Sequence, residues 1–206
     1  MRTDTSVRSS EHHVELFDSS KSLADTVAAY LLAGLNRGEA LLVVATPQHR
    51  ELLGRRLEEG GLNVRDAIMA NRLVMLDAAQ TLNKFMRRDL PSATAFDEVV
   101  GTLVERLSND QRVCIYGEMV DVLASQGNFA GAQQLEELWN VLGKREAFTL
   151  FCGYASAHFG DPESAKVLAG LCAAHTHLHR KASDRLAEFL LEQQGIVTVP
   201  SGSTPS

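Results

Sequence analysis

Short apolar segments alternate along this chain with amphipathic stretches long enough to form helices, and this alternation limits the folds open to it. The segment Ala40–Ala45 has no polar residue, a pattern typical of a strand covered on both faces, as in a parallel sheet. Strands are predicted at His13–Phe17, Ala40–Ala45, Arg72–Asp77, Arg112–Tyr116 and Phe148–Tyr154. The sequence therefore predicts an α/β fold of three layers, a mainly parallel sheet with helices on both faces.

The predicted helices follow the strands at regular intervals. After the first strand, Leu23, Val27 and Leu31 lie at helical spacing up to Gly34. Thr46-Pro47 places a capping hydroxyl before a proline at the first position of the next helix. Further helices are predicted over residues 79–88, 94–107, 118–126, 129–144 and 162–178.

The composition narrows the range of partners and compartments. The chain has 26 acidic and 20 basic residues, a net charge of −6, which argues against direct binding to nucleic acid or to an anionic membrane. Met1–Glu11 lacks the apolar core of a signal peptide, and no apolar stretch approaches the roughly 20 residues of a membrane-spanning helix. Cys114, Cys152 and Cys172 are too few and too scattered for a disulfide framework. We therefore expect a cytoplasmic protein.

The sequence divides into one domain with short appendages. Residues 1–11 form a polar lead, and residues 12–180 contain all the predicted strands. Residues 181–195 are predicted to form an amphipathic helix, with Leu186, Phe189 and Leu190 on one face, and residues 196–206 have the composition of a disordered tail.

The turn after the first predicted strand lacks the glycines of a phosphate-binding loop. It reads Phe17-Asp18-Ser19-Ser20-Lys21-Ser22, whereas a phosphate cradle needs small residues so that backbone N–H groups can converge on the anion. A serine nucleophile elbow of the form G-x-S-x-G is also absent. We therefore expect no catalysis. The Lys21-Ser22 pair keeps a cryptic ATPase as an alternative.

Polar residues near the ends of two strands are the candidates for a ligand site, because ligands of open α/β sheets bind beyond the carboxyl ends of strands. Glu118 follows Gly117 at such an end, as a pocket acceptor or as the first-turn acid of the next helix. Tyr116 and Tyr154 end two strands and either wall a pocket or pack at the rim. Trp139 is a further candidate, although its spacing with Leu135 and Leu142 favours the core.

A cysteine and two histidines form the candidate metal site. On a helix extending to residue 178 or beyond, Cys172, His175 and His179 would share one face, and all three are acceptable zinc ligands. A fourth ligand would have to come from elsewhere, and solvated histidines are the simpler interpretation.

Several segments, taken in order, resemble the MEDS domain, the sensory domain named for methanogens, methylotrophs and the regulator of dichloromethane metabolism. The segments are His12–Phe17, Gly38–Pro47, Arg72–Ala78, Tyr116–Val120, Leu135–Asn140 and Phe151–Tyr154. The resemblance covers about residues 12–180. It implies a fold similar to RecA- and KaiC-type ATPase cores without their phosphate-binding loop.

The resemblance also implies a function. MEDS domains are signal-input modules, proposed to sense hydrocarbon derivatives, that are often joined to a histidine kinase or a helix-turn-helix. The motif positions that carry over as pocket candidates are Tyr116, Glu118, Trp139 and Tyr154. No fused output domain follows residue 180 here, so we expect a signalling partner, or a homo-oligomer formed through the C-terminal helix, to relay the signal. The alternative is a ligand-free interaction module that acts on a kinase or a sigma-factor regulator. No cofactor is identified.

Overall fold

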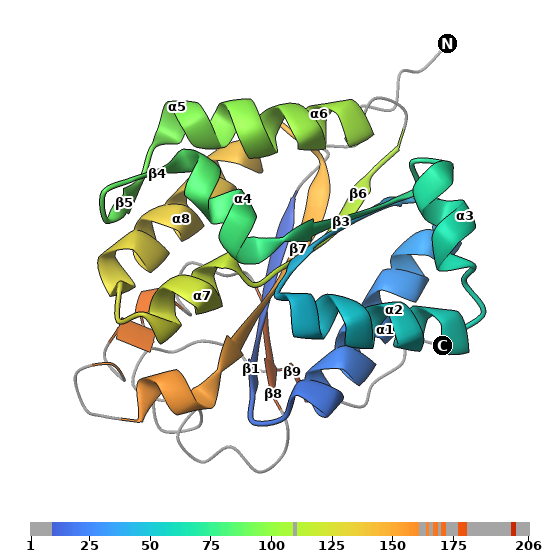
Figure 1. Ribbon diagram of the computed structural model, residues 1–206, viewed down its shortest axis with the longest axis horizontal. Helices are drawn as coiled ribbons and strands as arrows, with labels where there is room; N and C mark the ends of the chain where they lie inside the picture. The colour runs from blue at the N-terminus through green and yellow to red at the C-terminus, as the bar shows by residue number, and fades with distance from the viewer. Residues whose placement is uncertain are drawn as a thin grey trace.

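A computed structural model describes residues 10–108, 111–160, 164, 167, 168, 170, 171, 177–180, 199 and 200 (Figure 1). Its centre is a seven-stranded sheet in the order β3-β2-β6-β7-β1-β8-β9, and every neighbouring pair in it is parallel. The strands are β1 (Glu11–Phe17), β2 (Ala40–Ala45), β3 (Leu73–Asp77), β6 (Val113–Gly117), β7 (Phe148–Ala155), β8 (His177–Arg180) and β9 (Val199–Pro200). All five predicted strands are confirmed, and so is the α/β fold class.

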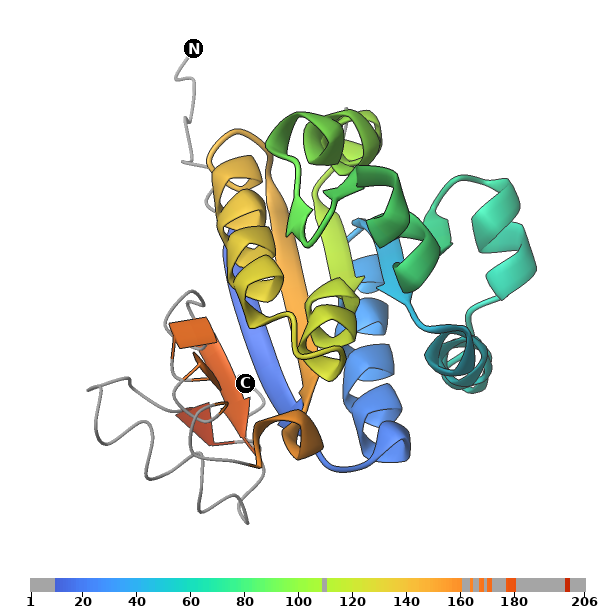
Figure 2. The same cartoon turned by 60° about the vertical axis from the view of Figure 1, so that its left-hand side comes forward.

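Helices cover both faces of this sheet, which gives the three predicted layers (Figures 1 and 2). One face carries α1 (Ser20–Asn36), α2 (Pro47–Glu59) and α3 (Val64–Met69). The opposite face carries α4 (Ala78–Phe85), α5 (Ala93–Phe96), the π-helix η1 (Asp97–Gly101), α6 (Thr102–Ser108), α7 (Met119–Ser125) and α8 (Phe129–Leu142). Among these helices none is long and apolar enough to cross a bilayer.

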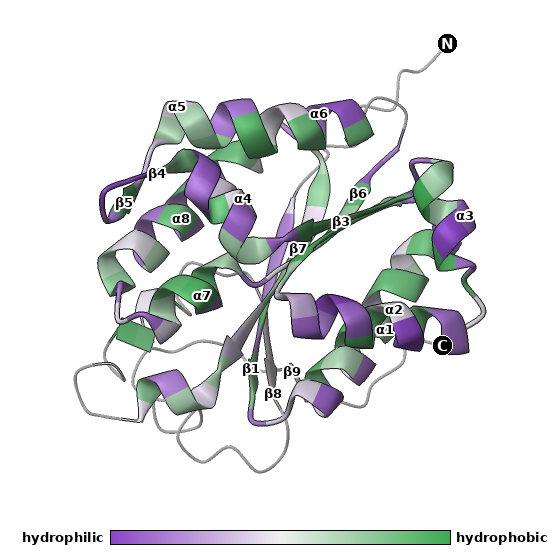
Figure 3. Cartoon of the chain, in the orientation of Figure 1, coloured by the Kyte–Doolittle hydropathy of each residue, from purple (hydrophilic) through white to green (hydrophobic). Residues whose placement is uncertain are grey.

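The two faces explain the apolar run of β2. Leu42 and Val44 pack into the core under α4–α8, whereas Leu41 and Val43 pack into the core under α1–α3. Side chains of a strand alternate between the two sides of the sheet, so a strand covered on both sides needs apolar residues at every position. Figure 3 shows the same division in the helices, whose hydrophobic stripes turn towards the sheet.

Two local predictions differ from the structure. The Thr46 side chain makes no capping hydrogen bond to α2, so the predicted capping role of its hydroxyl is wrong. The helix predicted over 79–88 ends at Phe85, because Met86–Arg87 (β4) pairs antiparallel with Leu90–Pro91 (β5) in a small hairpin. Arg88 in this hairpin has a φ of 57°, a left-handed conformation. Arginine rarely adopts this conformation, so its presence does not predict a turn here.

The end of the domain also differs. The residues described between 164 and 171 are helical, but His177–Arg180 forms strand β8 beside β1, so the predicted helix to residue 178 is wrong at its end. Val199–Pro200 pairs with β8, within the segment whose composition predicts a disordered tail. The predicted helix over 181–195 lies outside the described residues. A 3-10 turn, η2 (Ser156–Phe159), follows β7.

Candidate functional site

The connections that follow β2 and β6 run along opposite faces of the sheet, so a topological switch point lies between these two strands. After β2 it continues into α2 and then to β3 on the outer side of β2, whereas β6 lies on the inner side and leads into α7 on the opposite face. Val44 of β2 pairs with Gly117 of β6, so the two strands end side by side. Ligands of open α/β sheets bind at such switch points.

Glu118 fills this switch point. Its side chain is 2% exposed and accepts hydrogen bonds from the Thr46 backbone N–H at 2.8 Å and the Tyr116 hydroxyl at 2.7 Å, while His49 Nδ1 lies 2.6 Å from the carboxylate. We call Thr46, His49, Tyr116 and Glu118 the Glu118 cluster. Glu118 is the N-cap residue of α7, but its carboxylate makes no cap hydrogen bond to that helix. It binds the start of α2 instead.

Burial and charge shift the titration of this cluster. The hydrogen bond to Glu118 raises the pKa of His49 against the opposing effect of desolvation. Burial, and then the Glu118 charge, raise the pKa of the Tyr116 hydroxyl well above its usual range. The His49 ring also lies edge-on to Phe17, with ring centroids 5.9 Å apart, so the cluster reaches the end of β1. The site is therefore a closed polar network whose ion pair depends on pH.

This ion pair predicts a pH-dependent stability. The pKa of His49 is higher in the folded chain than in the unfolded chain, so its stabilising effect is fully present below pH of about 6.5 and is lost as the pH rises through the folded value. We expect His49→Gln to cost about 1–3 kcal/mol of unfolding free energy at pH 6 and little at pH 9. Urea unfolding of both proteins across this range measures the difference. A cost that grows with rising pH would contradict the assignment.

A second polar contact lies beside the cluster at the same edge. Asp121 of α7 accepts a hydrogen bond from the Ala155 backbone N–H at 2.9 Å and pairs with His158 Nδ1 at 2.9 Å. Burial raises the pKa of Asp121, while the bond from Ala155 and the histidine lower it. These contacts join α7 to the end of β7 and to the turn that follows it.

The structure separates the four predicted pocket residues into two groups. Tyr116 pairs in register with Phe151, and Tyr154 lies three residues beyond Phe151, so the two tyrosines point to opposite faces of the sheet. The prediction that Tyr116 and Tyr154 line the same pocket is therefore wrong. Only Tyr116 and Glu118 are brought together.

Tyr154 and Trp139 lie on the face covered by α8. The Tyr154 hydroxyl donates to the Glu136 carboxylate. Trp139 is 1% exposed and packs edge-to-face on Phe96 and Phe148, with ring centroids 5.3 and 5.9 Å away. This packing agrees with the core interpretation of Trp139.

The predicted metal stripe is not on one helix. His179 belongs to strand β8, so the helical spacing that aligned it with Cys172 and His175 does not hold. Cys172 and His175 lie outside the described residues.

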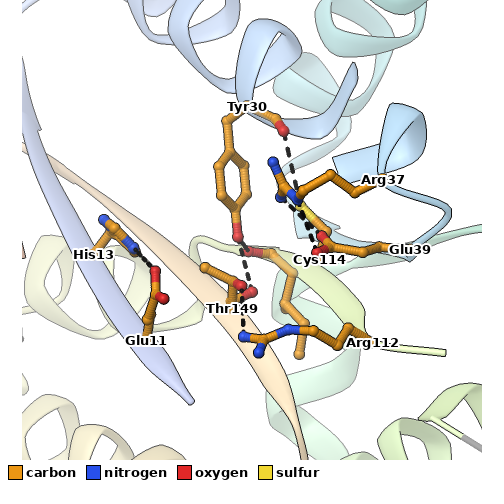
Figure 4. Close-up of polar contacts among 9 residues, drawn as sticks. Glu11, His13, Tyr30, Arg37, Glu39, Arg112, Cys114 and Thr149 are labelled. Atoms are coloured by element: carbon orange, nitrogen blue, oxygen red, sulfur yellow. Dashed lines mark hydrogen bonds and ion pairs between the residues drawn. The ribbon is translucent and has the colours of Figure 1, made fainter. Parts of the chain in front are cut away.

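A cavity of about 400 Å³ opens at the other edge of the sheet, where the strands begin (Figure 4). We call it the amino-edge cavity. Its lining consists of Glu11, His13, Tyr30, Arg37, Glu39, Arg112 and Thr149. This site was not predicted from the sequence. The available signal was the presence of charged residues next to the starts of three strands.

The floor of the amino-edge cavity is built from polar groups, of which Glu39 and Thr149 are buried and the Arg37 side chain is 53% exposed. The Tyr30 hydroxyl donates to the Thr149 carbonyl at 2.8 Å, and burial raises its pKa well above the usual range. Arg37 binds both oxygens of Glu39, at 3.0 and 2.9 Å. Arg112 donates to the Thr149 hydroxyl at 3.4 Å. Two guanidinium groups and two carboxylates thus surround one space, and they can offer donors and acceptors to the same small molecule.

Comparison with known proteins agrees with this architecture. The sequence model of one family matches residues 11–176, and its description is MEDS, MEthanogen/methylotroph, DcmR Sensory domain. A solved structure of a KaiC-like protein from the hyperthermophilic archaeon Pyrococcus horikoshii is similar, with 13% sequence identity and a TM-score of 0.50 over 83% of this chain and 71% of that chain. At this identity the likeness shows the fold alone. A comparison with curated proteins gives no match.

Proposed function

This chain belongs to the MEDS family of sensory domains, and we propose that it binds a small polar molecule in the amino-edge cavity and relays that signal to a protein partner. The observation that carries the proposal is the cavity itself. Its volume of about 400 Å³ falls within the roughly 300–1,000 Å³ of small-molecule sites, and polar groups converge on it from α1, from β1 and β7, and from the residues just before β2 and β6.

The lining indicates the chemistry of the ligand. Arg37 and Arg112 favour an anionic group, and Glu11 and Glu39 favour a hydrogen-bond donor. An uncharged hydrocarbon would desolvate these four groups without replacing their hydrogen bonds, which is costly. A small organic acid that also carries an amine or hydroxyl group fits better than a plain haloalkane. If the signal is a hydrocarbon derivative, we expect a polar one.

Signalling requires that the ligand favour one of two conformations. The cavity joins the C-terminal half of α1 to the beginnings of β2, β6 and β7, through Tyr30 and the Arg37–Glu39 pair. A ligand that competes for Glu39 or Arg37 would change how α1 is held against the sheet. We propose this contact as the origin of the relay.

We also propose that the chain hydrolyses no nucleotide. The turn between β1 and α1 consists of Asp18 and Ser19, and the Ser156 hydroxyl donates to the Asp18 carboxylate there. A carboxylate at this turn repels a triphosphate, and no glycine lets backbone amides surround one. Magnesium-dependent hydrolysis that is lost in Lys21→Ala would contradict this.

The ligand proposal is tested by a thermal-shift screen of small organic acids, amino acids, alcohols, halogenated hydrocarbons and nucleotides. We expect a polar compound to raise the melting temperature. Arg112→Met should then weaken its binding roughly tenfold to a hundredfold, the effect of losing a charged hydrogen bond. Calorimetric titration of that compound into each protein gives the affinities.

Arg55→Met is the matched control, because Arg55 pairs with Glu51 on the exposed surface of α2. It should leave the affinity unchanged. Binding that survives both Arg112→Met and Thr149→Val would remove the ligand from the amino-edge cavity. If Glu118→Gln abolished that same binding, the ligand would belong to the carboxyl edge instead.

A further inference from the structure

Three side chains of metal-binding type meet on the face of the sheet that α8 covers. Figure 2 shows α8 lying over this face. His12 comes from β1, Cys152 from β7 and Glu136 from α8, and all three are buried. Their ligand atoms all lie within 4.8 Å of one another. No short sequence spacing connects them, because each belongs to a different element.

The two distances from His12 Nε2 to the other ligand atoms are close to the edge lengths of a coordination tetrahedron. His12 Nε2 lies 3.3 Å from Cys152 Sγ and 3.2 Å from Glu136 Oε2. Zinc bonds of about 2.0–2.1 Å to nitrogen and oxygen and about 2.3 Å to sulfur give tetrahedral edges of roughly 3.3–3.6 Å. The two distances from His12 Nε2 are within a few tenths of an ångström of such edges, and the ligand atoms of Cys152 and Glu136 lie within 4.8 Å of each other.

Neighbouring groups orient two of the three ligands. His12 Nδ1 lies 3.1 Å from Asn140 Oδ1, an oxygen that can only accept, so the proton of a neutral His12 is on Nδ1. The lone pair of Nε2 therefore faces Cys152 and Glu136. The Tyr154 hydroxyl binds the other oxygen of Glu136. Metal-binding histidines and carboxylates are oriented by outer hydrogen bonds of this kind.

From this geometry we propose that His12, Glu136 and Cys152 bind one divalent transition-metal ion, with zinc the best match to a nitrogen, oxygen and sulfur ligand set. A divalent ion with one carboxylate and one thiolate is neutral overall, which suits a buried site. Burial, and then Glu136, raise the pKa of the Cys152 thiol well above its usual range, so the metal-free thiol is protonated. Binding displaces this proton to solvent as the sulfur–metal bond forms.

The proposal is tested on the full chain after removal of metal by a chelator. Titration with Co²⁺ should produce a thiolate-to-cobalt charge-transfer band and the visible bands of a tetrahedral ion, saturating at one ion per chain. Zn²⁺ should then displace the cobalt. The X-ray absorption spectrum of the zinc-loaded wild-type protein should show one sulfur scatterer together with nitrogen and oxygen. A shell without sulfur, or no binding of either ion, would overturn the proposal.

Cysteine variants locate the ion. Cys152→Ser should abolish the charge-transfer band, whereas Cys114→Ser should keep it, because Cys114 is buried on the opposite face of the sheet. Cys172→Ser should keep it as well. A band that is lost in Cys172→Ser and kept in Cys152→Ser would assign the metal to the C-terminal Cys/His segment and overturn the proposal.

Two variants that preserve shape complete the test. Glu136→Gln should weaken zinc binding at least about a hundredfold, and Asn140→Leu, which removes only the orienting acceptor, about tenfold to a hundredfold. The circular dichroism spectrum of each variant verifies that it is folded. Unchanged zinc affinity in a folded Glu136→Gln protein would contradict the assignment of Glu136 as a ligand.

Discussion

Replacement of Glu118 by alanine is expected to lower the free energy of unfolding by about 3–5 kcal/mol, the usual cost of removing one partner from a buried ion pair. The substitution leaves His49, the Tyr116 hydroxyl and the Thr46 N–H without their common acceptor in a site where the Tyr116 side chain is fully buried and the His49 side chain is 12% exposed. The start of α2 then loses its attachment to β6. Urea unfolding followed by circular dichroism measures the change.

Two variants serve as references for Glu118→Ala. Glu118→Gln retains one acceptor oxygen and should cost less than the alanine variant. Glu137→Ala removes an exposed carboxylate from α8 and should change the stability by no more than about 0.5 kcal/mol. A cost below about 1 kcal/mol for Glu118→Ala would show that the carboxylate is not a structural acceptor, and a ligand role at the carboxyl edge would then regain support.

Trp139→Ala is expected to cost about 3–5 kcal/mol, the range for deleting a buried large aromatic side chain. The indole is 1% exposed and lies between Phe96 and Phe148, so its removal leaves a cavity between α8 and the sheet that neighbouring rings cannot fill. Chemical unfolding measures the loss, and Trp139→Phe should recover part of it.

Val141→Ala is the control on the same helix. Val141 is 56% exposed, and its truncation should leave the stability within about 0.5 kcal/mol of wild type. A Trp139→Ala protein of near wild-type stability that no longer binds a ligand recognised by the wild type would contradict the core assignment and restore Trp139 as a pocket residue.

The strands were predictable because burial on both faces leaves a local pattern. Ala40–Ala45 has an apolar residue at every position, and the structure gives this strand the same bounds as the prediction. The short helix α3 and the β4–β5 hairpin have no comparable pattern. Asn71 follows the first of these and Arg88 lies in the second, and both have a positive φ, which is common for asparagine but uncommon for arginine.

The candidate sites show where a single sequence stops being informative. Glu118 could be found from its position after a strand, but its donors Thr46 and His49 lie about 70 residues earlier and meet it only because β2 and β6 are neighbours. The faces of Tyr116 and Tyr154 depend on the register of β6 against β7, which no local spacing reports. The amino-edge cavity likewise depends on which strands begin side by side.

The position of Trp139 makes its fluorescence a probe of α8. It is the only tryptophan of the chain, and it lies in α8 beside Asn140 and one helical turn from Glu136. Its emission therefore reports on the helix that contributes to the His12–Glu136–Cys152 group, while the amino-edge cavity is lined from the opposite side by Tyr30. Quenching by a bound transition metal and the response to an organic guest can thus be recorded separately in an unlabelled protein.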